Sequence, residues 1–111
     1  MIKVYLASAY RIGDTAINVK RQIDMADRLM DEGFSPYVPV LSHFQHLVHP
    51  RDYEDWIRND LIWLRLCDCI LRLVGESEGA DLECKEAAKN YIPVFFDIEE
   101  IKEYFKGKTN G

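Results

Sequence analysis

Two acidic residues, Asp60 and Glu83, are the positions in this sequence with the strongest potential for chemistry. Asp60 lies between Trp56 and Trp63 at helical spacings of four and three, where a carboxylate without a partner or a task is costly. Glu83 follows the turn GESEG and borders the inward stripe of a helix, within about its first turn. There the helix dipole and the free N–H groups favour an ionised carboxylate. Two carboxylates brought to one place predict acid, base or nucleophilic catalysis.

Each of these acids also has a purely structural explanation. Glu83 is either catalytic or a helix-start acid that complements the dipole, the role expected of its neighbours Glu76, Glu78 and Asp81. Its inward position favours the catalytic role for Glu83 over those neighbours. Asp60 is either a site residue or a structural acid with satisfied hydrogen bonds.

A second group of residues is typical of an anion site. Ser77 and Gly79 precede the helix of Glu83, where a hydroxyl and free backbone N–H groups can hold an anion. Arg11 is expected to face them from the loop 8–13 as a phosphate partner. The alternatives are ordinary turn residues and a solvated loop charge. Tyr5 lies near the end of the first expected strand. Considered alone, it is expected to be a core residue.

Three histidines, His43, His46 and His49, are spaced evenly by three and raise the possibility of zinc. The pattern around Pro50 predicts a polar loop, which would not fix the three rings on one helix face. No acidic or cysteine ligand follows at metal spacing, so we expect no metal here. The expected role of this segment is to cover the mouth of a pocket.

Helical and extended patterns alternate along the chain. Extended patterns cover residues 2–7, 34–40, 69–74 and 93–96, and helical patterns cover 14–32, about 53–66, 78–91 and 98–105. Asp14 is expected to cap the first helix and Gly33 to end it. The expected inward stripes are Val19, Ile23, Ala26 and Met30 in the first helix, and Ala80, Cys84, Ala87, Ala88 and Tyr91 in the third.

Strands that alternate with helices predict a parallel sheet with right-handed crossovers. We expect a three-layer α/β/α sandwich of the flavodoxin or Rossmann-like type, with four parallel strands in the order 2-1-3-4. Pro36 and Pro39 place the second strand at an edge, because proline cannot donate to a ladder. The switch point then falls between strands one and three. Loops 8–13 and 75–79 should face each other there, across the crevice where such sheets bind ligands.

The composition restricts the range of possible functions. The 111 residues predict one domain, 48% of them are apolar, and the net charge of −5 provides no basic stripe for nucleic acid. The first ten residues are too short for a membrane span and do not form a signal peptide, so we expect a cytoplasmic protein without membrane partners. Cys67, Cys69 and Cys84 are expected to be reduced packing residues.

With these residues in view, the chain resembles the nucleoside 2-deoxyribosyltransferase superfamily, especially its branch of 2′-deoxynucleoside 5′-monophosphate N-glycosidases. The likeness covers most of the chain up to about Phe96. Its strongest parts are NDLIWLRLCDCI, which contains Asp60, and SEGADLE, which contains Ser77, Gly79 and Glu83 at the family's spacing. A tyrosine in VYLAS and an arginine in the loop that follows also fit this family.

The resemblance implies cleavage of an N-glycosidic bond, by hydrolysis or transfer, without a metal or organic cofactor. It implies that Glu83 is the nucleophile, that Asp60 assists departure of the base and that Tyr5 orients the glutamate. It also implies that Ser77, Gly79 and the loop with Ser8, Arg11 and Gly13 hold a 5′-phosphate. The loop SAYRIG has fewer glycines than that branch usually shows.

Two alternatives to this assignment stay open. They are a non-catalytic nucleotide-binding or sensing domain and a phosphoribohydrolase acting on ribonucleotides. The expected partners are a small nucleoside or nucleotide and further copies of the chain, in a homodimer or higher homo-oligomer. The base, the acceptor and any residue that a neighbouring subunit supplies are not fixed by the sequence.

Overall fold

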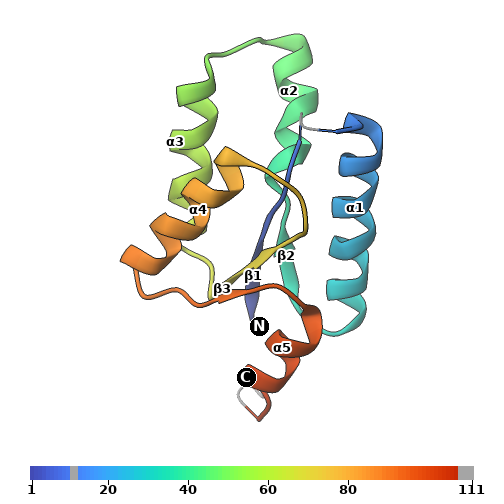
Figure 1. The fold of residues 1–111 in the computed structure, drawn as a ribbon, viewed down its shortest axis with the longest axis vertical. Helices are drawn as coiled ribbons and strands as arrows, with labels where there is room; N and C mark the ends of the chain where they lie inside the picture. Colours follow the sequence, from blue (N-terminus) through green and yellow to red (C-terminus); the bar gives the residue numbers. More distant parts are fainter. Residues whose placement is uncertain (11–12, 108–111) are drawn as a thin grey trace.

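A computed structural model describes residues 1–10 and 13–107, which form one parallel sheet between helices (Figure 1). The strands are β1 (Lys3–Ala7), β2 (Ser35–Tyr37), β3 (Cys69–Arg72) and β4 (Val94–Phe95). The helices are α1 (Thr15–Asp31), the 3₁₀ turn η1 (Pro39–Ser42), α2 (His43–Val48), α3 (Tyr53–Leu64), α4 (Glu78–Lys89) and α5 (Ile98–Tyr104).

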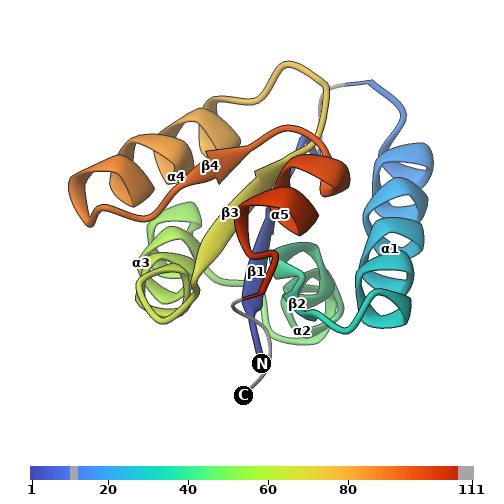
Figure 2. The same cartoon turned by 90° about the horizontal axis from the view of Figure 1, so that it is seen from below.

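The sheet has the expected architecture. Its strand order is β2-β1-β3-β4 and all pairs are parallel, with Tyr5 opposite both Tyr37 and Ile70. Helices α1 and α5 cover one face, while α3 and α4 cover the other (Figure 2). The three-layer fold with order 2-1-3-4 is therefore confirmed, and β2 with its Pro36 is an edge strand.

The two sheet faces bury different sets of side chains. The face toward α1 and α5 carries what we call the aliphatic core. Its buried members are Val4, Leu6, Leu29, Phe34, Cys69, Leu71, Leu73, Ile98, Ile101 and Phe105. The face toward α3 and α4 buries the smaller set Tyr5, Ala7, Leu64, Ile70, Ala80 and Ala87. Alternation along β1 and β3 produces this division, because successive side chains of a strand point to opposite faces.

Helix α1 begins and ends as expected but presents a different face to the sheet. The Asp14 carboxylate accepts a hydrogen bond from the Ile17 amide at 3.0 Å, and Gly33 takes a left-handed φ of 89° after the helix. The predicted stripe is wrong in part, because Ile23 and Met30 are exposed. The fully buried positions are Asn18, Gln22 and Leu29. Asn18 and Gln22 are polar, and their side chains bond to backbone carbonyls of the loop after β1.

Helix α4 also departs from its predicted stripe. Ala80 and Ala87 are buried as expected, but Ala88 faces solvent and Tyr91 is 96% exposed. Tyr91 has a φ of 58°, since the helix has already ended at Lys89 and the chain turns toward β4. Glu83 occupies the inward position instead. It therefore lies within the buried face and does not border it.

The segment with the histidines is helical, so the predicted polar loop is wrong. Pro39 starts η1, where its missing N–H costs nothing, and α2 continues to Val48. His43 and His46 thus lie about one turn apart on α2, and His49 follows its end. No helix among the described residues is long and apolar enough to cross a membrane.

Candidate active site

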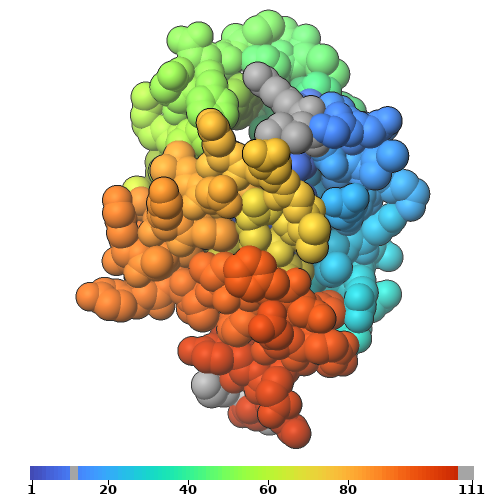
Figure 3. Space-filling model, in the orientation of Figure 1, coloured from blue at the N-terminus to red at the C-terminus, as the bar shows by residue number. Residues whose placement is uncertain are grey.

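A cavity of about 370 Å³ opens at the carboxyl ends of β1 and β3, where the sequence predicted a crevice. Figure 3 shows the hollow between the green segment of α2 and α3 and the yellow segment that follows β3. The two facing loops approach closely, since a Cβ added to Gly75 would lie 3.6 Å from the Ala9 Cβ. The cavity is lined from β1, α2, α3 and the start of α4.

Glu83 reaches this cavity from the buried face of α4. Only 7% of the residue is exposed, and its Oε2 accepts a short hydrogen bond from the Tyr5 hydroxyl. Tyr5 is fully buried on β1, where its ring stacks on Tyr37 with the ring centroids 5.5 Å apart. Trp63 continues the stack on the far side of Tyr37 at 5.6 Å. The phenol of Tyr5 is therefore held in one orientation toward the carboxylate.

Asp60 lines the same cavity from α3. It is 8% exposed, and its Oδ1 is buried without a hydrogen-bond partner among the described residues. Trp56 also lines the cavity one turn earlier, whereas Trp63 points to the aromatic stack and is partly exposed. An unsatisfied buried oxygen costs about 1–3 kcal/mol, so a structural acid would normally be paired. The predicted role as a satisfied structural acid therefore does not fit.

Burial dominates the electrostatics of the two acids. It raises the pKa of Asp60 to about 7. Burial also raises the pKa of Glu83 to about 7; the hydrogen bond from Tyr5 lowers it and the charge of Asp60 raises it. The predicted dipole effect on Glu83 is thus outweighed, because Glu83 lies beyond the first turn of α4 and is buried. Near neutral pH one proton can reside on the pair, and the Tyr5 donor favours the charge on Glu83.

Tyr5 itself stays a neutral donor. Burial first, and then the charges of Glu83 and Asp60, raise its pKa far above the ordinary range for a phenol. Burial likewise raises the pKa of Tyr37 to about 12. Tyr5 and Tyr37 are therefore two neutral phenols close to Asp60 and Glu83.

Arg72, at the end of β3, is a buried cation that the sequence analysis did not identify. The apolar pattern CILRLV predicted a strand covered on both faces, and Arg72 was treated as part of that run. Its guanidinium donates to the carbonyl oxygens of Leu73 and Gly75 at 2.5 and 2.8 Å and to Asp81 at 3.2 Å. It thereby ties the loop after β3 to α4 and lowers the pKa of Glu83.

The loop after β1 is held by the two polar residues on the inward face of α1. The Asn18 side-chain amide donates to the Tyr10 carbonyl at 3.2 Å, and the Gln22 amide donates to the Ala9 carbonyl at 3.1 Å. Ser8 lines the cavity, and its Oγ is the other buried side-chain atom without a partner among the described residues. The two residues with such atoms, Ser8 and Asp60, thus line the same cavity.

The remaining predicted loop residues are placed as follows. Gly13 is exposed with a φ of 85°, so it makes the turn into α1 and does not line the cavity. Arg11 lies outside the described residues. The predicted contact between Arg11 and the start of α4 therefore stays a prediction.

The start of α4 has the geometry expected of a helix N-terminus beside a ligand. The Ser77 Oγ accepts from the Ala80 amide at 3.1 Å, which makes Ser77 the N-cap, and both Ser77 and Gly79 line the cavity. Glu76 and Glu78 line the cavity beside them. The helix N-terminus attracts an anion, but these two carboxylates oppose it.

His43 and His46 line the cavity from α2, as expected of a segment at the pocket mouth. Nδ1 of His43 is hydrogen-bonded to the Tyr10 hydroxyl, which joins α2 to the loop after β1. Nδ1 of His46 accepts from the Trp56 indole at 2.9 Å. Within residues 1–10 and 13–107, no group of three His, Cys, Asp or Glu side chains is placed to hold a metal ion.

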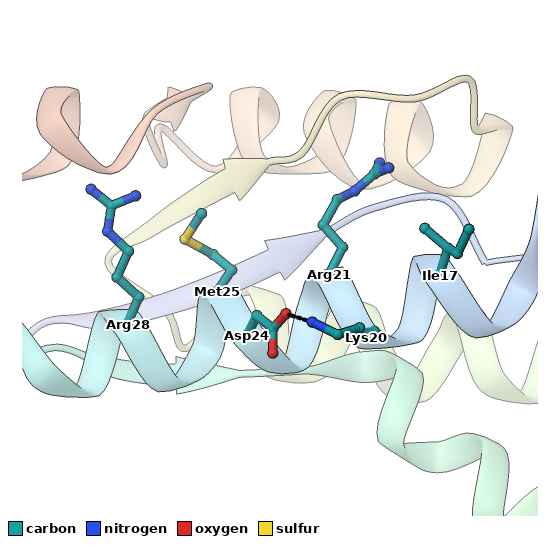
Figure 4. Close-up of a pocket in the computed structure, with 6 residues that line it drawn as sticks. All are labelled: Ile17, Lys20, Arg21, Asp24, Met25 and Arg28. Atoms are coloured by element: carbon teal, nitrogen blue, oxygen red, sulfur yellow. Dashed lines mark hydrogen bonds and ion pairs between the residues drawn. The ribbon is translucent and has the colours of Figure 1, made fainter.

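A second hollow lies along the flank of α1 that faces the chain after β3 and α5, away from the acids (Figure 4). Its cations have protein partners. Lys20 pairs with Asp24 at 2.5 Å, Arg21 donates to the Val74 carbonyl at 3.0 Å, and Arg28 lies 3.6 Å from Glu99. This hollow is therefore explained by packing of α1 against the chain after β3 and against α5.

The fold is similar to that of a solved protein described as a 2-deoxyribosyltransferase from the psychrotolerant bacterium Bacillus psychrosaccharolyticus. The two chains are 20% identical, the match covers 83% of this chain and 69% of the other, and the TM-score is 0.55. No protein-family model matches the sequence, and neither does a curated protein. The sequence resemblance to this superfamily is thus accompanied by a shared fold.

Proposed function

We propose that this protein cleaves the N-glycosidic bond of a 2′-deoxynucleoside or its 5′-monophosphate through Glu83. The observation that carries the proposal is the hydrogen bond from Tyr5 to buried Glu83, beside an Asp60 oxygen that has no partner among the described residues. A charged carboxylate and a protonated acid in one cavity are the two groups that glycoside cleavage needs. The shared fold with a 2-deoxyribosyltransferase agrees with this chemistry.

The reaction proceeds in two steps. A Glu83 oxygen attacks the anomeric carbon as the bond to the base breaks, and the bonding electron pair leaves with the base nitrogen. Asp60 donates its proton to the departing base, which is a poor leaving group without one. Water or a second base then attacks the anomeric carbon, its proton passes to the Asp60 carboxylate, and the bond to Glu83 breaks with its electron pair on the released carboxylate. Tyr5 keeps the glutamate oriented and supports its charge before the attack.

The 5′ end of the substrate would lie at the start of α4. Ser77, Gly79 and the helix N-terminus would bind it, with Ser8 across the cavity and Arg11 in the adjoining loop. Because Glu76 and Glu78 flank this place, a nucleoside and its monophosphate must be compared directly as substrates. The same panel should include ribonucleotides, which would identify a phosphoribohydrolase.

The decisive variant is Glu83→Gln, which keeps the volume of the side chain but removes its charge and nucleophilicity. Release of base in a single turnover should fall by about a thousandfold or more while the protein stays folded. Glu86→Gln is the matched control, since Glu86 lies one turn further on α4 and pairs with Arg65 at 2.7 Å. A deoxyribosyl adduct should be found on Glu83 by mass spectrometry.

Near wild-type turnover by folded Glu83→Gln, or an adduct on Glu76 or Glu78, would show that another carboxylate is the nucleophile. Nucleotide binding without release of base from any substrate would favour the non-catalytic sensing domain.

We also propose that the chain forms a homodimer or higher homo-oligomer. Exposed apolar side chains gather on and just before α2, namely Leu41, Phe44, Leu47 and Val48. Such a group next to a ligand cavity suits an interface between copies. Light scattering after size exclusion should give at least twice the mass of the chain, and Phe44→Glu should lower it. A monomer at all concentrations would contradict this assignment.

A further inference from the structure

His46 makes contacts that fix which of its ring nitrogens carries a proton. Its Nδ1 accepts from the Trp56 indole N–H at 2.9 Å and from the Arg51 backbone N–H at 3.2 Å. Both partners are donors only, so Nδ1 must be the acceptor. In the neutral ring the proton then resides on Nε2.

His46 lines the cavity, and no hydrogen bond to its Nε2 is found among the described residues. The ring is half-buried, and its contact with the Trp56 ring, with centroids 5.8 Å apart, holds its plane. His46 therefore presents one fixed donor to a ligand.

This donor lies on the side of the cavity that holds Asp60. Trp56, the partner of His46, precedes Asp60 by one turn on α3, whereas Ser77 and Gly79 line the cavity from the start of α4. In the proposed reaction Asp60 protonates the departing base. The base must therefore lie toward α2 and α3, next to His46.

We propose that His46 determines base specificity by donating from Nε2 to a carbonyl oxygen of the base, and that the site selects 6-oxopurines over 6-aminopurines. This inference rests on the proposed function. A purine protonated at N7 presents its position 6 beside that nitrogen. There a 6-oxopurine has an acceptor and a 6-aminopurine has a donor. A fixed N–H donor can bond the first and opposes the second.

The test compares deoxyinosine with deoxyadenosine as substrates and hypoxanthine with adenine as ligands. The wild type should prefer the 6-oxo member of each pair by about tenfold or more, and His46→Ala should reduce both preferences to about twofold. His49→Ala is the matched control and should keep the wild-type preference, because His49 does not line the cavity. Trp56→Phe should weaken the preference, because it removes the indole N–H donor and leaves only the Arg51 backbone N–H to fix the ring.

Nitrogen-15 spectra of the histidine rings give a readout that does not need turnover. They should show a protonated Nε2 on His46 in the wild type and a weaker bias toward that tautomer in Trp56→Phe, where only the Arg51 backbone N–H still donates to Nδ1. A protonated Nδ1 in the wild type would overturn the proposal. An unchanged preference in folded His46→Ala would overturn it as well.

The two proposals fail in different ways. If no nucleoside releases base but hypoxanthine binding still depends on His46, the proposed reaction fails and the recognition by His46 stands. If base is released with the same preference by wild type and His46→Ala, the reaction stands and the recognition fails.

Discussion

The two faces of the sheet are built from the same two strands, but only one of them buries charged side chains beside its apolar ones. On the face toward α1 and α5, Val4, Leu6 and Leu71 belong to the aliphatic core. On the other face the alternate positions of β1 and β3 include Tyr5 and Arg72, and buried acids arrive from α3 and α4. Strand alternation allows one face to secure the fold while the other carries groups that are costly to bury.

The costs on the polar-bearing face are specific. Asp60 and Ser8 each have a buried oxygen without a hydrogen-bond partner among the described residues, and burial raises the pKa of both Asp60 and Glu83 to about 7. Selection for stability alone would not retain such buried groups. Their combination in one cavity is therefore typical of a site selected for function. The aliphatic core must offset these costs. Substitutions in the aliphatic core should therefore change stability alone, whereas substitutions on the other face should also change the reaction.

The largest effect on stability is expected from Leu71→Ala. Leu71 is fully buried in the aliphatic core, so the variant should lose about 2–5 kcal/mol of unfolding free energy through lost burial and the cavity left behind. Base release per folded molecule should stay near the wild-type value. Urea denaturation combined with active-site titration measures both quantities. A large catalytic loss in the folded fraction would mean that the two faces are not independent.

Arg72→Met should have the next largest effect, one position along the strand and on the opposite face. The variant leaves the Leu73 and Gly75 carbonyl oxygens without their donor and should cost about 1.5–3 kcal/mol, the range for hydrogen bonds to a charged group. It should also raise the pKa of Glu83, because Arg72 lowers it in the wild type. The pH dependence of base release should therefore move to higher pH, unlike that of Leu71→Ala.

Arg28→Met is the matched control for that substitution. The Arg28 and Glu99 side chains are 53% and 63% exposed, and their ion pair lies on the outer surface. An exposed pair contributes about 0–1 kcal/mol, so little loss of stability and no shift of the pH profile are expected. Equal effects of the two Arg→Met variants would remove the special role assigned to Arg72.

The sequence predicted the sheet well because its signals are local. Alternation in residues 3–7, the apolar run before Gly75 and the prolines near β2 determine strand positions, and the crossover rule then gives the order. The meeting of Asp60 and Glu83 in one cavity followed from that order together with helical spacing, whereas the place of Tyr5 beside Glu83 was implied only by the family resemblance. These residues come from three different elements, and only the topology brings them together.

The errors in α1 and at Arg72 have a common cause, which is polar burial that hydropathy cannot detect. Asn18 and Gln22 replace apolar residues on the inward face of α1 because they bind the loop carbonyls of Tyr10 and Ala9. The Arg72 side chain is buried because backbone oxygens surround it. A polar residue at an apolar spacing was the available signal in each case, and it pointed to the loops of the site.

A stability effect of the opposite sign is expected for Asp60→Asn. In the unfolded chain Asp60 ionises near pH 4, whereas in the folded protein burial holds its pKa at about 7. Between these values the folded state binds more protons than the unfolded state, so Asp60 lowers stability as pH rises and its full cost is present above pH 7. A shift of about three pH units sets a ceiling of about 4 kcal/mol. The buried amide of asparagine retains about 1–3 kcal/mol of that cost, which leaves a gain of about 1–3 kcal/mol at most.

Asp60→Asn should therefore be more stable than the wild type at pH 8 and no more stable at pH 4, while it releases base more slowly. Denaturation at both pH values measures the free energy of unfolding, and single-turnover assays at pH 7 measure the rate of base release. Leu71→Ala serves as the contrast, since its loss of stability should be the same at both pH values. If Asp60→Asn were destabilised at pH 8, the Asp60 carboxylate would have to be paired in the folded protein, and its assignment as the protonated acid would be wrong.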